Sequence, residues 1–104
     1  MIIRGGSNVS PQEVEEALYQ HPAVMEAGVI GVPDELYGER VMACVSLREG
    51  KVADEEEPRE FARSRLADYK VPERIEFLAE LPKGVTGKVQ RRALKETALR
   101  TAAG

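Results

Sequence analysis

Two neighbouring segments, residues 23–32 and 40–48, most constrain how this 104-residue chain can fold. The first, Ala23–Val32, is β-branched and apolar on both faces, which predicts a central, well-covered strand. Pro33 and Asp34 begin a turn and Gly38 offers another, so the two segments are expected to form an antiparallel hairpin with a long connection. In the second segment, Arg40–Arg48, apolar residues recur at every second position. This spacing places on one face of a strand Val41, Ala43, Val45 and Leu47.

Residues 10–13 are typical of a helix start. Ser10 can cap the helix, Pro11 fits its first position, and Glu13 completes a capping box. His21-Pro22 ends the helix, because a residue that precedes proline is driven out of the α region. The apolar stripe of this helix consists of Val14, Ala17 and Leu18.

Further elements complete the predicted fold. A strand at Met1–Ile3 enters the loop Arg4–Val9, a second helix begins near Pro58, a strand covers Arg74–Leu78, and a last helix begins near Gln90. The core-facing residues of these two helices are Phe61, Ala62, Leu66, Ala93, Leu94 and Ala98. The sequence therefore predicts an α+β domain with a small antiparallel or mixed three-stranded sheet and two to three packed helices.

Composition excludes several classes of function. With 42% hydrophobic and 32% charged residues the chain resembles one soluble globular domain, and its net charge of −3 does not suggest a nucleic-acid partner. No apolar run is long enough for a transmembrane helix. The only cysteine, Cys44, is expected to be a buried structural thiol, which fits a reducing cytoplasm. The only histidine, His21, has no Cys or His companion, so no metal site is expected.

The segment Leu81–Leu94, LPKGVTGKVQRRAL, is the strongest candidate for chemistry. Gly84 and Gly87 bracket two residues in a backbone that can bend closely around a partner, and Lys88 follows with a compact charge on a flexible stem. Such a lysine can neutralise charge that develops on a phosphate or carboxylate oxygen. A solvated surface turn is the alternative. A P-loop is excluded, because it needs four residues between its glycines and Ser or Thr after the lysine.

This segment resembles the last signature motif of the adenylate-forming enzymes, the superfamily of acyl-CoA synthetases, peptide-synthetase adenylation domains and luciferases. Gly84 departs from that motif, which usually has Thr or Asn there. Further matches occur in order and at familiar spacings, at Gly5–Glu15, His21–Val24, Gly31–Asp34, Tyr37–Glu39 and Tyr69–Pro72. The resemblance covers nearly everything from Met1 to about Glu96, and implies the small C-terminal domain of these enzymes.

The resemblance implies a role in joining a carboxylic acid to coenzyme A with ATP. Lys88 stands at the position of the family's catalytic lysine, which supplies positive charge during formation of the acyl-adenylate. Thr86 and Gly87 would shape its loop and contact the adenylate or ATP. Asn8 would lie near the adenylate.

Coenzyme A contacts are implied at two further places. Gly5 and Gly6 match a glycine pair that lines the tunnel for the pantetheine thiol, although from the residues alone they could simply make a turn before the helix. Arg63 falls where some relatives hold coenzyme A phosphates, and a solvated arginine is the alternative.

Nothing in the sequence matches the parts that bind ATP, Mg²⁺ or the acyl group, which the family keeps in a large N-terminal domain. The chain, residues 1–104, is therefore expected to be a severed or separately encoded lid domain of a cytoplasmic ligase, closest to fatty-acid or aryl-acid CoA ligases. ATP and coenzyme A would be co-substrates of the full enzyme, and the chain alone would need no cofactor. The alternative that stays open is a stand-alone interaction module that docks on a partner protein. A basic nucleic-acid module built on Lys88, Arg91, Arg92 and Lys95 is disfavoured by the net negative charge and the scarcity of aromatic residues.

Overall fold

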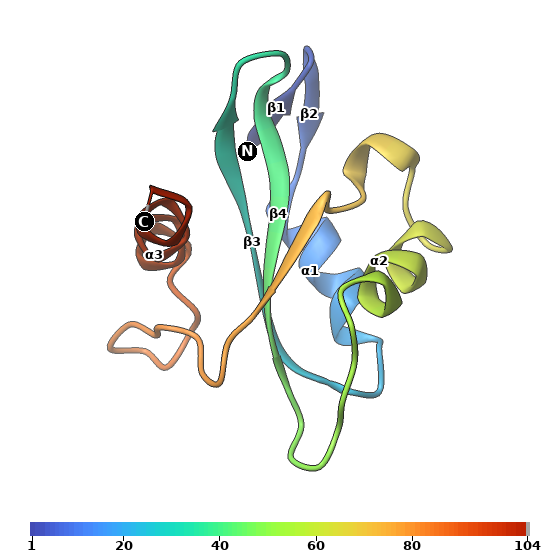
Figure 1. The fold of residues 1–104 in the computed structure, drawn as a ribbon, viewed down its shortest axis with the longest axis vertical. Coiled ribbons are helices and arrows are strands. Elements are labelled where there is room, and N and C mark those ends of the chain that lie inside the picture. Colours follow the sequence, from blue (N-terminus) through green and yellow to red (C-terminus); the bar gives the residue numbers. More distant parts are fainter. Residues whose placement is uncertain (104) are drawn as a thin grey trace.

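The computed structural model describes the backbone of residues 1–103 and the side chains of residues 1–98. A single sheet separates two layers of helices: α1 and α2 lie on one face and α3 on the other (Figure 1). The elements in order are β1 (Ile2–Arg4), β2 (Ser7–Val9), α1 (Pro11–Tyr19), β3 (Val24–Asp34), β4 (Gly38–Leu47), α2 (Glu56–Arg63), a 3₁₀ helix (Asp68–Lys70), β5 (Arg74–Phe77) and α3 (Arg91–Ala103). None of the helices described is long and apolar enough to span a membrane.

The predicted α+β class is confirmed, with five strands described in place of the three expected. Their order is β2-β1-β4-β3, and β5 pairs with β4 in parallel while the other pairs are antiparallel. The expected loop Arg4–Val9 contains β2, because Gly5 and Gly6 allow a two-residue turn that returns the chain along β1.

The β3–β4 hairpin forms as predicted, but its connection is only three residues, Glu35–Tyr37. Asp34 makes this tight turn possible, because its Oδ2 accepts the amides of Leu36 (3.1 Å) and Tyr37 (2.7 Å). Strand β3 lies at an edge of the sheet, so the expectation of a central strand was wrong. It is apolar on both faces because helices cover both faces, whereas β1 and β4 are the strands with neighbours on both sides.

The helix boundaries follow local signals with small differences. Ser10 caps α1 by accepting the Glu13 amide at 3.5 Å, and Gln20 ends the helix just before His21-Pro22. In a complete capping box the Glu13 carboxylate would also accept the amide of Ser10. That bond is not found among the described residues, because the Glu13 carboxylate binds Lys70 at 2.9 Å. Helix α2 begins at Glu56, slightly before the expected Pro58.

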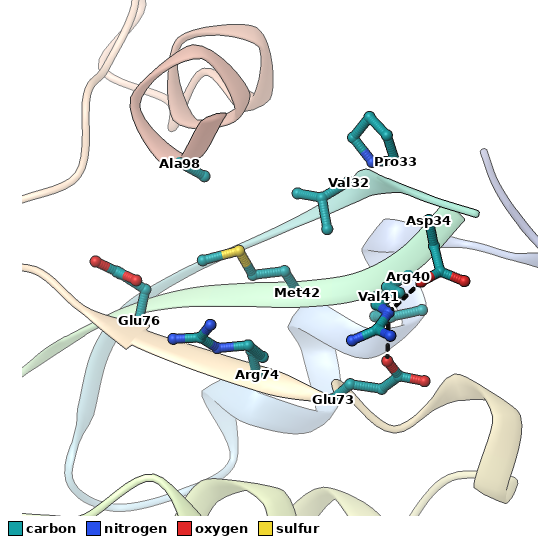
Figure 2. A pocket seen from close by; sticks show the side chains of 10 residues that line it. All are labelled: Val32, Pro33, Asp34, Arg40, Val41, Met42, Glu73, Arg74, Glu76 and Ala98. Carbon is teal, nitrogen blue, oxygen red and sulfur yellow. Dashed lines mark hydrogen bonds and ion pairs between the residues drawn. The ribbon is translucent and has the colours of Figure 1, made fainter. Parts of the chain in front are cut away.

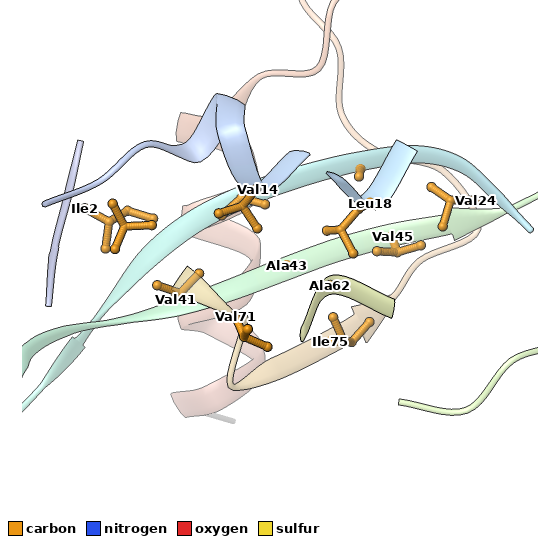
Figure 3. Close-up of a cluster of buried hydrophobic side chains, with 13 residues drawn as sticks. Ile2, Val14, Leu18, Val24, Val41, Ala43, Val45, Ala62, Val71 and Ile75 are labelled. Atoms are coloured by element: carbon orange, nitrogen blue, oxygen red, sulfur yellow. The ribbon is translucent and has the colours of Figure 1, made fainter. Parts of the chain in front are cut away.

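Two apolar clusters hold the helices on the sheet. The larger joins α1 and α2 to β3, β4 and β5, and Figure 3 shows its side chains between the helices and the strands. The smaller lies on the other face, under α3, and consists of Ile30, Met42, Cys44, Leu81, Leu94 and Ala98. Strand β4 contributes to both clusters, since Val41, Ala43 and Val45 face one side while Met42 and Cys44 face the other.

Helix α3 fits against β3 because Gly28 has no side chain. A Cβ at this position would overlap Leu94 Cδ1 and would lie 3.1 Å from Val89 Cγ1. Leu94 is fully buried there. The missing Cβ therefore allows the final helix, and the segment that leads into it, to approach the backbone of the sheet.

We predict that Gly28→Ala destabilises the chain by about 1–3 kcal/mol, because the added methyl group overpacks the contact with Leu94. The midpoint of urea unfolding measures this loss. Gly84→Ala is the matched control, since the nearest atoms there belong to the exposed side chain of Gln90, which can move. Equal stabilities for the two variants would contradict the close approach.

Cys44 is expected to be unreactive in the folded chain. Its side chain is buried under α3, and burial, followed by the negative charge of Glu76, raises the pKa of the thiol to about 11. A raised pKa keeps the thiol protonated at pH 8, and burial also blocks access by the reagent. Labelling with a thiol reagent at pH 8 should therefore require unfolding in denaturant. Rapid labelling of the native chain would show that this part of the core opens readily.

Candidate functional site

The segment Pro82–Gln90 folds into a small hairpin, named here the lysine hairpin. Lys83 and Val89 form an antiparallel bridge at its base. Three backbone hydrogen bonds close it: the amide of Gly84 donates to Lys88 O (2.9 Å), that of Gly87 to Gly84 O (3.0 Å), and that of Gln90 to Pro82 O (2.9 Å). Lys88 therefore sits on a hydrogen-bonded turn.

The turn of the lysine hairpin needs a glycine at one place. Gly87 has φ +81°, a left-handed conformation that the last residue of a three-residue hairpin loop takes and that glycine adopts without strain. Val85 is fully exposed at the tip, and Thr86 and Lys88 are exposed beside it. The three residues expected to act together, Thr86, Gly87 and Lys88, are thus adjacent and accessible.

Ion pairs fasten both ends of the lysine hairpin. At its start, Lys83 Nζ lies 3.0 Å from Glu26 Oε2 on β3. Just after its end, Arg91 binds Glu15 of α1 through two hydrogen bonds, of 2.6 and 2.8 Å, and this carboxylate raises the pKa of Arg91. A cavity of about 420 Å³ lies between α1, β3 and the hairpin, lined by Gln12, Glu15, Tyr19, Glu26, Ala27, Gly87, Lys88, Val89 and Arg91.

The other glycine pair forms the turn between β1 and β2. Gly5 (φ +58°) and Gly6 (φ +86°) both have positive φ, as a type I′ turn requires. The Gly5 amide donates to Tyr37 O at 2.8 Å, so this turn is attached to the tip of the β3–β4 hairpin. A Cβ on Gly6 would meet no atom within 4 Å. Asn8 is exposed on β2 of the same hairpin.

The expected site residues fall into separate places. In Figure 1 the Gly5–Gly6 turn lies at the top of the view, whereas the lysine hairpin lies in the lower half on the α3 side. Arg63 lies near the C-terminal end of α2, where its guanidinium pairs with Glu60. The structure therefore groups Thr86 and Gly87 with Lys88, and Asn8 with the glycine pair, and it does not bring the two groups together.

A second cavity, of about 390 Å³, opens between α3 and strands β4 and β5 (Figure 2). Met42, Val32 and Ala98 give it an apolar wall, and Arg40 bridges Asp34 (2.5 Å) and Glu73 (3.4 Å) at one end. None of the site residues expected from the sequence lines this cavity. Three of its five charged side chains, those of Asp34, Arg40 and Glu73, are paired with one another, and the lysine hairpin stays the stronger candidate.

Sequence reasoning missed the two glutamates that hold the lysine hairpin. Glu15 lies outside the apolar stripe predicted for its helix, and Glu26 lies within a segment that was interpreted from its apolar residues. Their partners, Lys83 and Arg91, are far away in the chain. The only available signal was the presence of these two cations on either side of the glycine loop.

Comparison with known proteins matches the chain to a family of C-terminal domains and to part of a CoA ligase. Residues 13–88 match the family model described as AMP-binding enzyme C-terminal domain. The chain is 57% identical over 96 residues to the long-chain-fatty-acid–CoA ligase of Bacillus subtilis (strain 168), an alignment that covers 92% of the chain and 17% of that protein.

Solved structures give the same result. A fatty acyl CoA synthetase of Mycobacterium tuberculosis matches with a TM-score of 0.89 and 39% identity, over 97% of the chain and 20% of that protein. ATP-bound MatB from Rhodopseudomonas palustris matches with a TM-score of 0.88 and 38% identity, over 93% and 19%. The chain thus spans about a fifth of the length of the relatives it matches.

Proposed function

This chain belongs to the family of AMP-binding enzyme C-terminal domains, and from that premise we propose that it is the mobile catalytic lid of an acyl-CoA ligase. Its relatives are named as CoA ligases, and one matching structure holds ATP. The observation that carries the proposal is Lys88, exposed on a closed hairpin whose two ends are anchored to the fold.

In the first half-reaction, a carboxylate oxygen of the acid attacks the α-phosphorus of ATP and pyrophosphate leaves. The attacking carboxylate loses negative charge as the bond to phosphorus forms, and negative charge grows on the α-phosphoryl oxygens and on the leaving pyrophosphate. Lys88 supplies the opposing charge, and a well-placed donor of this kind lowers a barrier by roughly 3–4 kcal/mol, about 10²–10³ in rate. Thr86 and Gly87 set the direction of the backbone at Lys88 and lie against the nucleotide.

In the second half-reaction, the thiol of coenzyme A attacks the acyl carbonyl carbon and AMP leaves. Gly5 and Gly6 line the path of the thiol, because a turn without side chains lets an extended pantetheine chain lie against the backbone. The space around Gly6 supports this role, since no atom lies near its Cβ position. Asn8 contacts the adenylate, and Arg63 binds a phosphate of coenzyme A.

The lid acts with a large N-terminal adenylation domain, which supplies the binding sites for ATP and the carboxylic acid, in the cytoplasm. Mg²⁺ belongs to that domain. In the part of the chain that the structure describes, no three His, Cys, Asp or Glu side chains are grouped to hold a metal ion. Lys88 is the positive charge that this chain contributes.

We predict that the 104-residue chain folds by itself and does not catalyse adenylation. Its core is closed on both faces of the sheet, whereas the nucleotide site belongs to the large domain. A cooperative thermal transition should accompany the absence of acid-dependent exchange of pyrophosphate into ATP. Robust exchange by the pure chain would mean that it carries a complete active site of its own.

We also predict that substitutions separate the two half-reactions in a full-length ligase with this chain as its C-terminal domain. Lys88→Ala should slow pyrophosphate release by about 10²–10³ and leave transfer from pre-formed acyl-adenylate to coenzyme A intact. Gly6→Leu should do the reverse, because a branched side chain obstructs the path of the thiol.

Gly50→Leu is the matched control for Gly6→Leu. Gly50 also has positive φ (+80°, against +86°) and no atom near its Cβ position, so the two variants carry similar backbone strain. Only the change at Gly6 should slow thioester formation. Equal losses in both half-reactions for Lys88→Ala and Gly6→Leu would show one shared site and refute the lid mechanism.

A further inference from the structure

Both ends of the lysine hairpin are fastened to the fold by a glutamate. Glu26 on β3 pairs with Lys83 at the start of the hairpin (3.0 Å), and Glu15 on α1 pairs with Arg91 just after its end (2.6 and 2.8 Å). Glu15 and Glu26 line the same cavity as Lys88. Lys88 therefore lies in the chain between Lys83 and Arg91, and the glutamates that bind these two residues belong to different elements, β3 and α1.

These two ion pairs are better defined than ordinary surface pairs. The Glu15 side chain is only 13% exposed, and its Oε2 also accepts the amide of Val29 at 2.8 Å, which gives the carboxylate a second attachment besides Arg91. Two parallel bonds from a guanidinium then determine direction as well as distance. The Glu26 side chain is 18% exposed, and its second oxygen is buried without a hydrogen-bond partner among the described residues. Lys83 is the cation that compensates this mostly buried charge.

The rest of the lysine hairpin has little packing that could hold its tip. Val89, at its base, packs into the smaller apolar cluster, whereas Val85, Thr86 and Lys88 are exposed. Packing fixes where the hairpin leaves the core, and the two ion pairs fix the direction in which it points. Lys83 lies on the first strand of the hairpin, so without its ion pair the two strands open more readily and the tip loses its direction.

We propose that Glu15 and Glu26 are positioning residues for Lys88, acting through Arg91 and Lys83. The inference rests on the proposed role of Lys88 in adenylation. A lysine has a flexible stem, so its backbone must be fixed if the charge is to reach a defined oxygen. A misplacement of about 1 Å at a reacting group can cost about 10² in rate, and the anchors prevent such a displacement.

The first measurement follows the hairpin itself by hydrogen exchange in the 104-residue chain. The amides of Gly84 and Gln90 donate across the hairpin and report whether it stays closed. Glu26→Gln should speed the exchange of these two amides at least tenfold more than it speeds the exchange of core amides, because the neutral side chain loses the ionic attraction to Lys83. The control, Glu56→Gln, removes a charge paired with Arg59 on α2, on the other face of the sheet, and should leave both rates unchanged.

The second measurement uses the full-length ligase and assays each half-reaction separately. Glu15→Gln and Glu26→Gln should each slow adenylation by 10- to 100-fold and leave thioester formation from pre-formed acyl-adenylate within twofold. The charge-reversed pair, Glu26→Lys with Lys83→Glu, should restore adenylation to within about threefold. A loss that merely reflected lower stability would affect both half-reactions and would not be restored.

The outcomes distinguish the two hypotheses. If Lys88→Ala strongly slows adenylation while Glu15→Gln and Glu26→Gln leave its rate normal, the positioning role of the two glutamates is wrong and the role of Lys88 stands. Unchanged exchange at Gly84 and Gln90 in Glu26→Gln also overturns the positioning role. If Lys88→Ala adenylates normally, the proposed function fails and the positioning role fails with it.

Discussion

The close approach of Leu94 to the backbone of Gly28 is the constraint on which the rest of the structure depends. It seats α3 on one face of the sheet, and the lysine hairpin immediately precedes α3. The position of Lys88 is thus set by a contact that forms only because one residue of β3 has no side chain. A larger residue at Gly28 would move the helix outward, and the hairpin would move with it.

The sheet then determines how far apart the two candidate loops lie. The β1–β2 turn is joined to the tip of the β3–β4 hairpin through Gly5 and Tyr37, whereas the lysine hairpin is held against β3 and α1. The first loop is part of the β-sheet and the second is fastened to it through β3, so neither loop can approach the other without breaking these contacts. Under the proposed function, a lid that uses both loops turns as a body between the half-reactions, a kind of gating motion common in multidomain enzymes.

Local signals in the sequence were sufficient for much of the fold. The Ser10-Pro11 start, the stop at His21-Pro22 and the apolar pattern of residues 23–48 predicted α1 and the β3–β4 hairpin, since each depends on neighbours within a few residues. The expected long connection was wrong because the Asp34 carboxylate closes a tighter turn through two amides. The edge position of β3 was missed because apolar faces report coverage by helices and carry no information about strand neighbours.

For the candidate site, the sequence by itself determined the turn that carries Lys88 and the glycines that make both turns possible, because a positive φ is a local requirement that glycine meets. Only the tertiary structure decided that the two glycine turns lie far apart and that Glu15 and Glu26 anchor the lysine hairpin. Glu15 and Arg91 are 76 positions apart in the sequence. Whether two such distant charges meet depends on how the helices pack on the sheet. The same packing determines which carboxylates are buried away from water.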